Sequence, residues 1–270
     1  MQNYTIQRFT LQDIPYIHGL QPADWGDISA NFISYCTQDF CYPIKVLHGH
    51  HIIGLGCLIC YQDSAWLAHI IVSENYRGQG IGKLIVNALI DTAQRKGIRA
   101  IHLIATDLGL PVYSKLGFQA SCNYLFYDRP QQYTAQPISE RLMPATQKHY
   151  AQILAMDAEI AGDKRELLIR QHFNHCVVYE ADNMVQGYFL PTLGNGPLYA
   201  KTEASAEALM ELKYSSAAMA VLPEVNTVGL AWLEARGFTR KVYTAIRMTL
   251  STATIWQPQH IFCRIGGNYG

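Results

Sequence analysis

The chain has 270 residues, of which 49% are hydrophobic and 16% charged, so it is globular and long enough for about two domains. Its 21 basic and 21 acidic side chains cancel, which argues against nucleic-acid or anionic-membrane binding through a broad charged surface. Seven cysteines without the spacing of a disulfide scaffold indicate a cytoplasmic protein, and no segment has the roughly 20 apolar residues of a membrane span.

The first half of the chain alternates strand and helix patterns. In chain order we expect a strand at 4–9, one or two short helices up to 36, a hairpin at 44–48 and 52–61, a strand at 66–72, a helix at 80–96, a strand at 98–105, a short helix at 111–117 and a strand at 118–127. Three successive strands before the long helix suggest an antiparallel meander.

The second half follows a stretch rich in proline and glutamine that predicts a linker. We therefore expect domains at 1–130 and 145–270, joined by a linker at 131–144. Beyond it we expect a helical region at 150–172, strands at 176–180 and 185–190, a helix at 204–214, a strand at 217–222 and a helix at 227–236. Aligning Gly237-Phe238 with Gly117-Phe118, an offset of 120, suggests an internal duplication.

A glycine-rich turn between an apolar strand and an amphipathic helix carries the functional signal. Glycines allow a tight turn with no Cβ in the way, and the N–H groups at the start of a helix attract an anion. The turn and the start of its helix consist of Arg77, Gly78, Gln79, Gly80, Ile81, Gly82 and Lys83. This pattern predicts a phosphate cradle, although a tight connection would look the same.

Two other phosphate motifs fit less well. The dinucleotide-binding fingerprint needs Gly-x-Gly-x-x-Gly, whereas Gly78, Gly80 and Gly82 are evenly spaced; Asp107, a possible ribose ligand, keeps a nucleotide-dependent oxidoreductase as a weak alternative. A P-loop is excluded, because Arg77 stands where its first glycine is needed.

The segment from Val72 to Gly82 resembles the acetyl-CoA motif of the GNAT acetyltransferase superfamily, Arg/Gln-x-x-Gly-x-Gly/Ala. The stretch Tyr113-Ser114-Lys115-Leu116-Gly117-Phe118 is similar to the Tyr-x-x-Leu-Gly-Phe segment of the same superfamily. The chain looks like a subfamily in which a GNAT domain precedes a second, GNAT-like domain. The resemblance implies an α/β (α+β) fold with two tandem domains, each a mixed, largely antiparallel sheet flanked by helices.

The resemblance also implies a cofactor site for acetyl-CoA. Pantetheine would lie between the strands at 66–72 and 98–105, against the main chain of Ile70, Ile71 and Val72, with Thr106 also in contact. The pyrophosphate would lie on the turn from Arg77 to Lys83. The second half has Lys201-Thr202-Glu203 where the first has its glycines, which implies that it lacks the cofactor.

The implied reaction is direct attack of an amine of a small molecule or peptide on the thioester. Tyr113 matches the family's general acid, which would protonate the departing thiolate. His69, directly or through water, and Glu74 are candidate bases, and ordered water alone is a third possibility.

Asp24, Trp25 and Asp27 lie in the region that borders the acceptor site in the superfamily. We expect no metal, because His48, His50 and His51 surround a hairpin turn where polar residues are common. A catalytically silent acyl-CoA sensor or interaction module is the alternative function. The sequence leaves the acceptor and the oligomeric state open.

Overall fold

The structure is a computed structural model that describes residues 4–22, 25–134, 136–251 and 255–270. Asp24 therefore lies outside the described residues. The elements of the first half are β1 (Tyr4–Arg8), η1 (Leu11–Tyr16), α1 (Ser29–Thr37), β2 (Cys41–His48), β3 (His51–Cys60), β4 (Ser64–Val72), η2 (Glu74–Tyr76), α2 (Ile81–Arg95), β5 (Ala100–Ala105), α3 (Leu110–Lys115) and β6 (Gln119–Asp128).

The second half continues with β7 (Leu142–Pro144), α4 (Gln147–Ala161), α5 (Glu166–His172), η3 (Phe173–His175), β8 (Val177–Ala181), β9 (Met184–Phe189), β10 (Leu198–Ala200), α6 (Glu203–Tyr214), β11 (Met219–Pro223), α7 (Thr227–Ala235), β12 (Thr239–Ser251), η4 (Pro258–His260) and β13 (Ile261–Cys263). The helical region expected at 150–172 is two helices, because Gly162 ends α4 with a left-handed backbone at φ 75°. The end of the expected linker is a strand, β7, which pairs with β8.

Two sheets form the framework. One has eight strands in the order β1-β2-β3-β4-β5-β12-β6-β11, and the other has five in the order β13-β10-β9-β8-β7. The strands β2 to β4 form the expected antiparallel meander, and β1 extends it by pairing antiparallel with β2. The strands β4 and β5 run parallel. The larger sheet thus combines strands of both halves.

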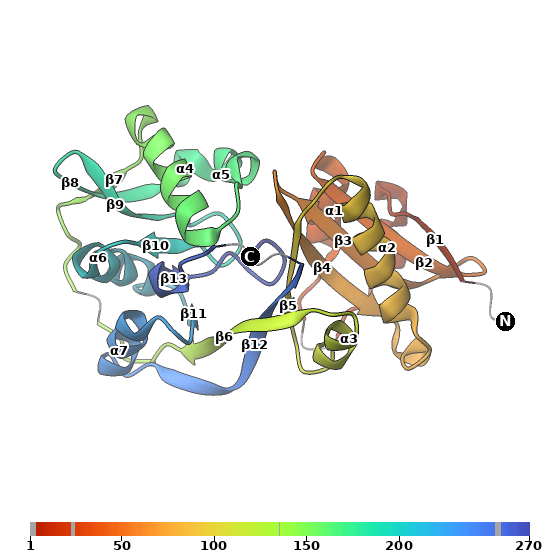
Figure 1. Cartoon of the computed structure of the whole chain (residues 1–270). Helices are drawn as coiled ribbons and strands as arrows, with labels where there is room; N and C mark the ends of the chain where they lie inside the picture. The colour runs from red at the N-terminus through yellow and green to blue at the C-terminus, as the bar shows by residue number, and fades with distance from the viewer. Residues whose placement is uncertain (1–3, 23–24, 135, 252–254) are drawn as a thin grey trace.

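The strand β12 connects the two halves most directly. It pairs antiparallel with β5 on one side and with β6 on the other, although more than 110 residues separate it from either. Figure 1 shows β6 and β12 side by side, extending in opposite directions between the two halves, beneath the other strands. The second half therefore supplies two strands of the larger sheet, β12 between β5 and β6 and β11 at the edge beside β6.

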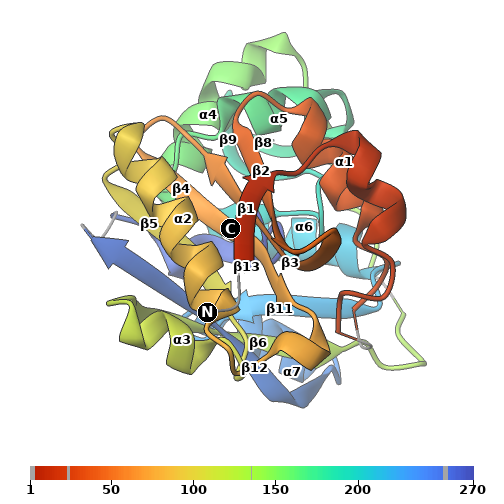
Figure 2. The same cartoon turned by 90° about the vertical axis from the view of Figure 1, so that its right-hand side faces the viewer.

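Helices cover the two faces of the larger sheet differently. The helices α2 and α3 pack on one face through a core that includes Ile85, Leu89 and Tyr113. The helix α1 packs on the opposite face, in a core shared with the second half, and Figure 2 shows α1 and α2 on opposite sides of the first strands. Burial of both faces explains why β4 is apolar at nearly every position instead of alternating.

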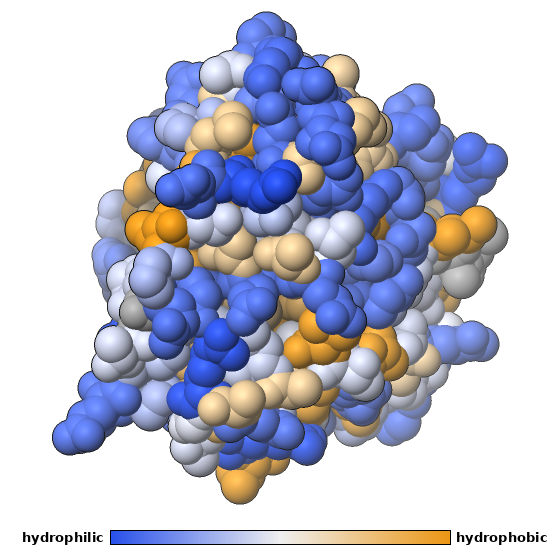
Figure 3. Space-filling model, turned by 90° about the vertical axis from the view of Figure 1, so that its left-hand side faces the viewer, coloured by the Kyte–Doolittle hydropathy of each residue, from blue (hydrophilic) through white to orange (hydrophobic). Residues whose placement is uncertain are grey.

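The outer surface of the second half is mostly hydrophilic. Figure 3 shows this face, on which apolar residues occur in small, separate groups. No helix of the described residues is both long and apolar enough to cross a bilayer.

Candidate functional site

The parallel strands β4 and β5 separate at their carboxyl ends. Their pairing runs from Ser64 with Ala100 to Leu67 with Leu103 and stops there, although β4 continues to Val72. A β-bulge at His69, with φ 49°, shifts the register of β4 against β3 at this point. Because a bulge bends its strand, β4 turns away from β5, and we call the region between the two strands beyond their last pair the wedge.

Ile70, Ile71 and Val72 belong to the part of β4 that lies beyond its last pair with β5. Ile71 is buried in the core shared with the second half, and Ile70 and Val72 pack on the α2 side, so their side chains are already in contact with protein. Any ligand in the wedge would therefore meet their backbone groups.

The glycine turn connects β4 to α2. Gly78 and Gly80 have φ values of 75° and 82°, in the left-handed region that favours glycine, and a Cβ built on either would have no atom within 4 Å. Gly80 is the N-cap of α2 and provides no side-chain hydrogen bond to the helix. The turn is therefore an open cradle whose backbone N–H groups and positive helix end suit an anion.

Side chains brace this cradle. Arg77 Nε donates to the Val72 carbonyl at 3.3 Å, and its guanidinium lies 3.8 Å from the Glu74 carboxylate. Gln79 accepts a 2.7 Å hydrogen bond from the Tyr4 hydroxyl and donates to the Asn75 carbonyl at 3.2 Å.

The remaining residues of the turn differ in exposure. Ile81, the first residue of α2, has a buried side chain, so only its backbone can meet a ligand. Lys83 is exposed on the first turn of the same helix. Gly82 lies next to Val72, since a Cβ there would be 3.8 Å from that side chain.

Tyr113 lies on α3, on the α2 side of the sheet. Its ring packs beside Phe118 with a centroid distance of 5.9 Å, and a Cβ on Gly109 would come within 2.6 Å of it. Burial raises the pKa of Tyr113 to about 12, so the phenol keeps its proton at neutral pH. The carbonyl of Thr106 accepts from the N–H groups of Gly109 and Leu110 and so starts the same helix.

His69 lies on the opposite face, where Trp25 and Phe32 pack edge-on to its ring. Its Nδ1 is 2.8 Å from the Tyr35 hydroxyl, whose oxygen accepts a 2.9 Å hydrogen bond from Asn268. Burial lowers the pKa of His69 to about 4, so the imidazole is neutral at pH 7. Sequence reasoning missed Tyr35 and Asn268, which no local motif marks.

The acidic candidates have local roles. Asp27 Oδ1 accepts from the backbone N–H and the hydroxyl of Ser29 at the start of α1, and these bonds lower its pKa. Trp25 is half-buried against His69, whereas Glu74 is exposed on the turn beside Arg77. Of the predicted acceptor residues that the structure describes, Trp25 alone contacts His69.

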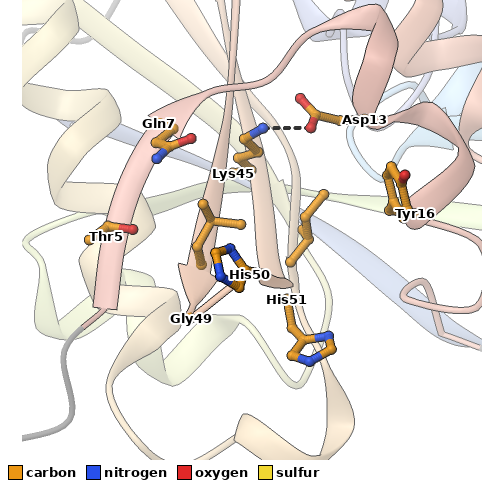
Figure 4. A pocket seen from close by; sticks show the side chains of 10 residues that line it. Thr5, Gln7, Asp13, Tyr16, Lys45, Gly49, His50 and His51 are labelled. Atoms are coloured by element: carbon orange, nitrogen blue, oxygen red, sulfur yellow. Dashed lines mark hydrogen bonds and ion pairs between the residues drawn. The ribbon is translucent and has the colours of Figure 1, made fainter.

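A separate hollow of about 540 Å³ lies over β1, β2 and β3 (Figure 4). Within it, Lys45 and Asp13 form an ion pair at 2.5 Å. Burial acts to raise the pKa of Asp13, but the bonds from Lys45 and Thr10 outweigh it and lower that pKa. None of the site residues predicted from the sequence lines this hollow.

Two family models match the chain. One, described as an acetyltransferase (GNAT) family, matches residues 10–118, and the other, described as an acetyltransferase (GNAT) domain, matches residues 153–263. The two matched regions correspond to the two halves and together cover most of the chain.

The chain is also similar to individual proteins. Uncharacterized protein YyaT of Bacillus subtilis is 31% identical over 91 residues, which are 34% of this chain and 62% of that protein, less than two thirds of its length. Glucosamine 6-phosphate N-acetyltransferase of Trypanosoma brucei is 37% identical over 117 residues, which are 41% of this chain and 76% of that protein. A crystal structure from Pyrococcus horikoshii, with a proposed acetyltransferase function, matches with a TM-score of 0.84 at 20% identity and covers 100% of this chain and 97% of its own.

Proposed function

This chain belongs to the GNAT acetyltransferase family, with two domains of that family in tandem, and from that premise we propose that it transfers an acetyl group from acetyl-CoA to an amine. The observation that carries the proposal is the combination of the wedge with the open glycine cradle at its end. Both lie in the half that also presents Tyr113.

The residues around the wedge fit coenzyme A. Backbone groups of Ile70, Ile71 and Val72 would pair with the pantetheine amides, and the N–H groups from Gly78 to Lys83 would hold the pyrophosphate. Arg77 and Lys83 add positive charge at the rim, and Thr106 lies at the neighbouring end of β5. When bound, acetyl-CoA supplies the thioester from which the amine takes the acetyl group, with loss of one proton from the amine and gain of one by the sulfur.

Tyr113 is the proposed proton donor. Because its pKa is raised to about 12, the phenol carries a proton that it gives up only to a strongly basic group, such as a departing thiolate. Leu233 occupies the corresponding position of the second half and has no proton to donate.

His69 is better suited to holding a group than to acting as a base. Asn268 donates to the Tyr35 oxygen, so the Tyr35 proton is free to bond His69 Nδ1, which places the imidazole proton on Nε2. A pKa of about 4 also lies far below the value that favours general-base catalysis near neutral pH. We therefore propose that water removes the amine proton and that His69 Nε2–H positions the acceptor or that water.

A His69→Gln variant tests this role. If water takes the proton, turnover should fall by less than about tenfold, whereas loss of a general base costs about a hundredfold or more. Glu74→Gln tests the other candidate base in the same way, and its turnover should stay near that of the wild type.

The second half is proposed to cover the acceptor side of the sheet without binding cofactor. It provides Asn268 next to Tyr35, and it provides β12 beside β5. The proposed division is 1–130 and 145–270, and β12 of the second part completes the sheet of the first.

The decisive experiment first compares how ligands change the melting temperature and then measures acetyl transfer to amines. Acetyl-CoA should raise the melting temperature, and NAD and ATP should do so much less, because a ligand stabilises the state that binds it. An amine panel with detection of released thiol then measures transfer. Equal stabilisation by all three ligands would remove the acetyl-CoA site, whereas binding without transfer to any amine would favour the silent sensor.

A further inference from the structure

Three buried arginines surround Tyr124 of β6, on the face of the larger sheet that the second half covers. They are Arg165, Arg247 and Arg264, and the positive charge of each acts on the Tyr124 phenol. Arg165 is neutralised, because it forms an ion pair with the buried Asp157 at 2.5 Å. The other two arginines need a different explanation.

Arg247 and Arg264 have buried donors with no acceptor. Arg247 Nη2 and Arg264 Nε and Nη1 have no hydrogen-bond partner within the part of the chain that the structure describes, and no carboxylate there forms an ion pair with either residue. The nearby Asp163 carboxylate accepts from Ser64 and, at 2.9 Å, from Trp66 Nε1. A buried guanidinium with unused donors is costly, which indicates that an anion completes it.

Aromatic rings hold both guanidinium groups in place. That of Arg247 lies 3.9 Å from the Trp256 ring centroid and 5.4 Å from that of Trp66. That of Arg264 lies 4.9 Å from the Tyr124 ring centroid. Rings satisfy the flat faces of a guanidinium but not its in-plane N–H groups, so these stay available.

The two arginines are next to the wedge. Ile104 is the first residue of β5 beyond its last pair with β4, and it pairs with Arg247 on β12. Ile104 also packs on the cluster that contains Tyr124 and Phe126, the two rings under Arg264. A narrow cavity between the halves follows the same face, and its lining includes Trp66, Tyr124, Asp163, Arg165, Arg247 and Trp256 but not Arg264.

We propose that the acceptor carries an anionic group, a carboxylate or a phosphate, that Arg247 and Arg264 bind while its amine reaches the wedge. This inference rests on the proposed function, since it names the substrate class of that site. The guanidinium N–H groups match the oxygens of either anion.

Matched amine pairs test the proposal. Ethanolamine phosphate is compared with ethanolamine, and 4-aminobutyrate with butylamine, so that each pair differs in its anion and the two pairs separate phosphate from carboxylate. We expect kcat/KM to be at least about tenfold higher for the anionic member of one pair. Equal values within both pairs would overturn the proposal while leaving acetyl transfer intact.

An Arg264→Gln variant localises the effect. It should lose about tenfold in kcat/KM for the preferred anionic amine and keep its value for the neutral partner to within about twofold. Arg240→Gln, which changes an exposed arginine of β12, is the control and should behave as the wild type. A folded Arg264→Gln variant that retains the full preference would contradict the assignment.

A binding measurement makes the test independent of turnover and of the variant's folding. Because Trp66 and Trp256 flank Arg247, the anionic amine should change the tryptophan fluorescence of the wild-type protein and its neutral partner should not. Absence of any change with both anionic amines would overturn the anion site. Failure of acetyl-CoA to bind in the separate titration would overturn the proposed function instead.

Discussion

The two halves share a fold but treat the start of their central helix in opposite ways. The N-cap of α2 is Gly80, which has no side chain to cap the helix, whereas the N-cap of α6 is Thr202, whose hydroxyl accepts from the Ser205 N–H at 3.2 Å. The second half thus satisfies its own helix end, and the first leaves it for a ligand.

The halves also differ beside the strand that precedes this helix. In the first half β4 separates from β5 and leaves the wedge. In the second half β13 pairs with β10, and the Asn226 amide donates to the Ile261 carbonyl of β13 at 2.8 Å. The position that corresponds to the wedge is therefore filled by the chain itself.

This comparison shows that two domains of one family can keep the same fold while their chains satisfy the corresponding backbone groups in different ways. A capping hydroxyl and a short added strand satisfy the backbone groups that a cofactor would otherwise pair. Both differences are local, and variants of either half can show whether they restrict acetyl-CoA binding to the first half.

The largest expected effect is on catalysis by a Tyr113→Phe variant. Turnover should fall by about a hundredfold to ten-thousandfold, because the proton donor is lost, while acetyl-CoA affinity stays nearly unchanged. Steady-state kinetics and calorimetric titration measure the two quantities. Wild-type turnover in a folded variant across the pH range would show that Tyr113 is not the essential acid.

The next largest effect is a loss of stability at low pH caused by His69, which lies beside the wedge. Since the pKa of His69 falls to about 4 in the folded state, the unfolded chain binds a proton more readily between about pH 6.5 and 4. Stability from this group is therefore present above about pH 6.5 and is lost as the pH falls, by about 3 kcal/mol at most.

Urea unfolding of the wild type and of His69→Gln across this range measures that loss. The decline in stability should be smaller in the variant, because it lacks the contribution of His69. Some decline should remain, because other buried histidines still contribute. His102, whose pKa is lowered to about 3 by burial and by Arg247, is one such group. Parallel curves for the two proteins would contradict the role given to His69.

A Gly80→Val variant should weaken acetyl-CoA binding by at least about tenfold, because a side chain would enter the open cradle and the backbone would be strained. Gly97→Val is the matched control. Gly97 has φ 72° and equally open space around its Cβ position, but it lies at the other end of α2. We expect both variants to lose stability to a similar extent and only Gly80→Val to lose affinity for acetyl-CoA. If the two folded variants bind acetyl-CoA equally well, the turn is not part of the site.

The smallest effect is expected in the second half. Thr202→Ala should lower the free energy of unfolding by about 1 kcal/mol through loss of the helix cap. Acetyl-CoA affinity should not change if, as proposed, the second half binds no cofactor. A changed affinity in calorimetric titration would mean that the two halves are coupled or that the second half retains a site.

Local features of the sequence predicted much of the first half. The glycine turn, the helix after it and the short helix with Tyr113 are encoded by neighbouring residues, since positive φ values and apolar periodicity act over a few positions. The strands of the meander were predicted for the same reason, and the family match confirms the two tandem domains.

The tertiary structure alone decided how the halves are joined and what the acceptor side contains. Nothing near Thr239 indicates that β12 inserts between β5 and β6, because strand partners are chosen by contacts more than 110 residues away. The same holds for the hydrogen bonds that link Asn268 to Tyr35 and Tyr35 to His69, and for the burial of Arg247 and Arg264. A charged residue in a sequence is expected to be exposed, and only packing against distant aromatic rings shows that these two are enclosed.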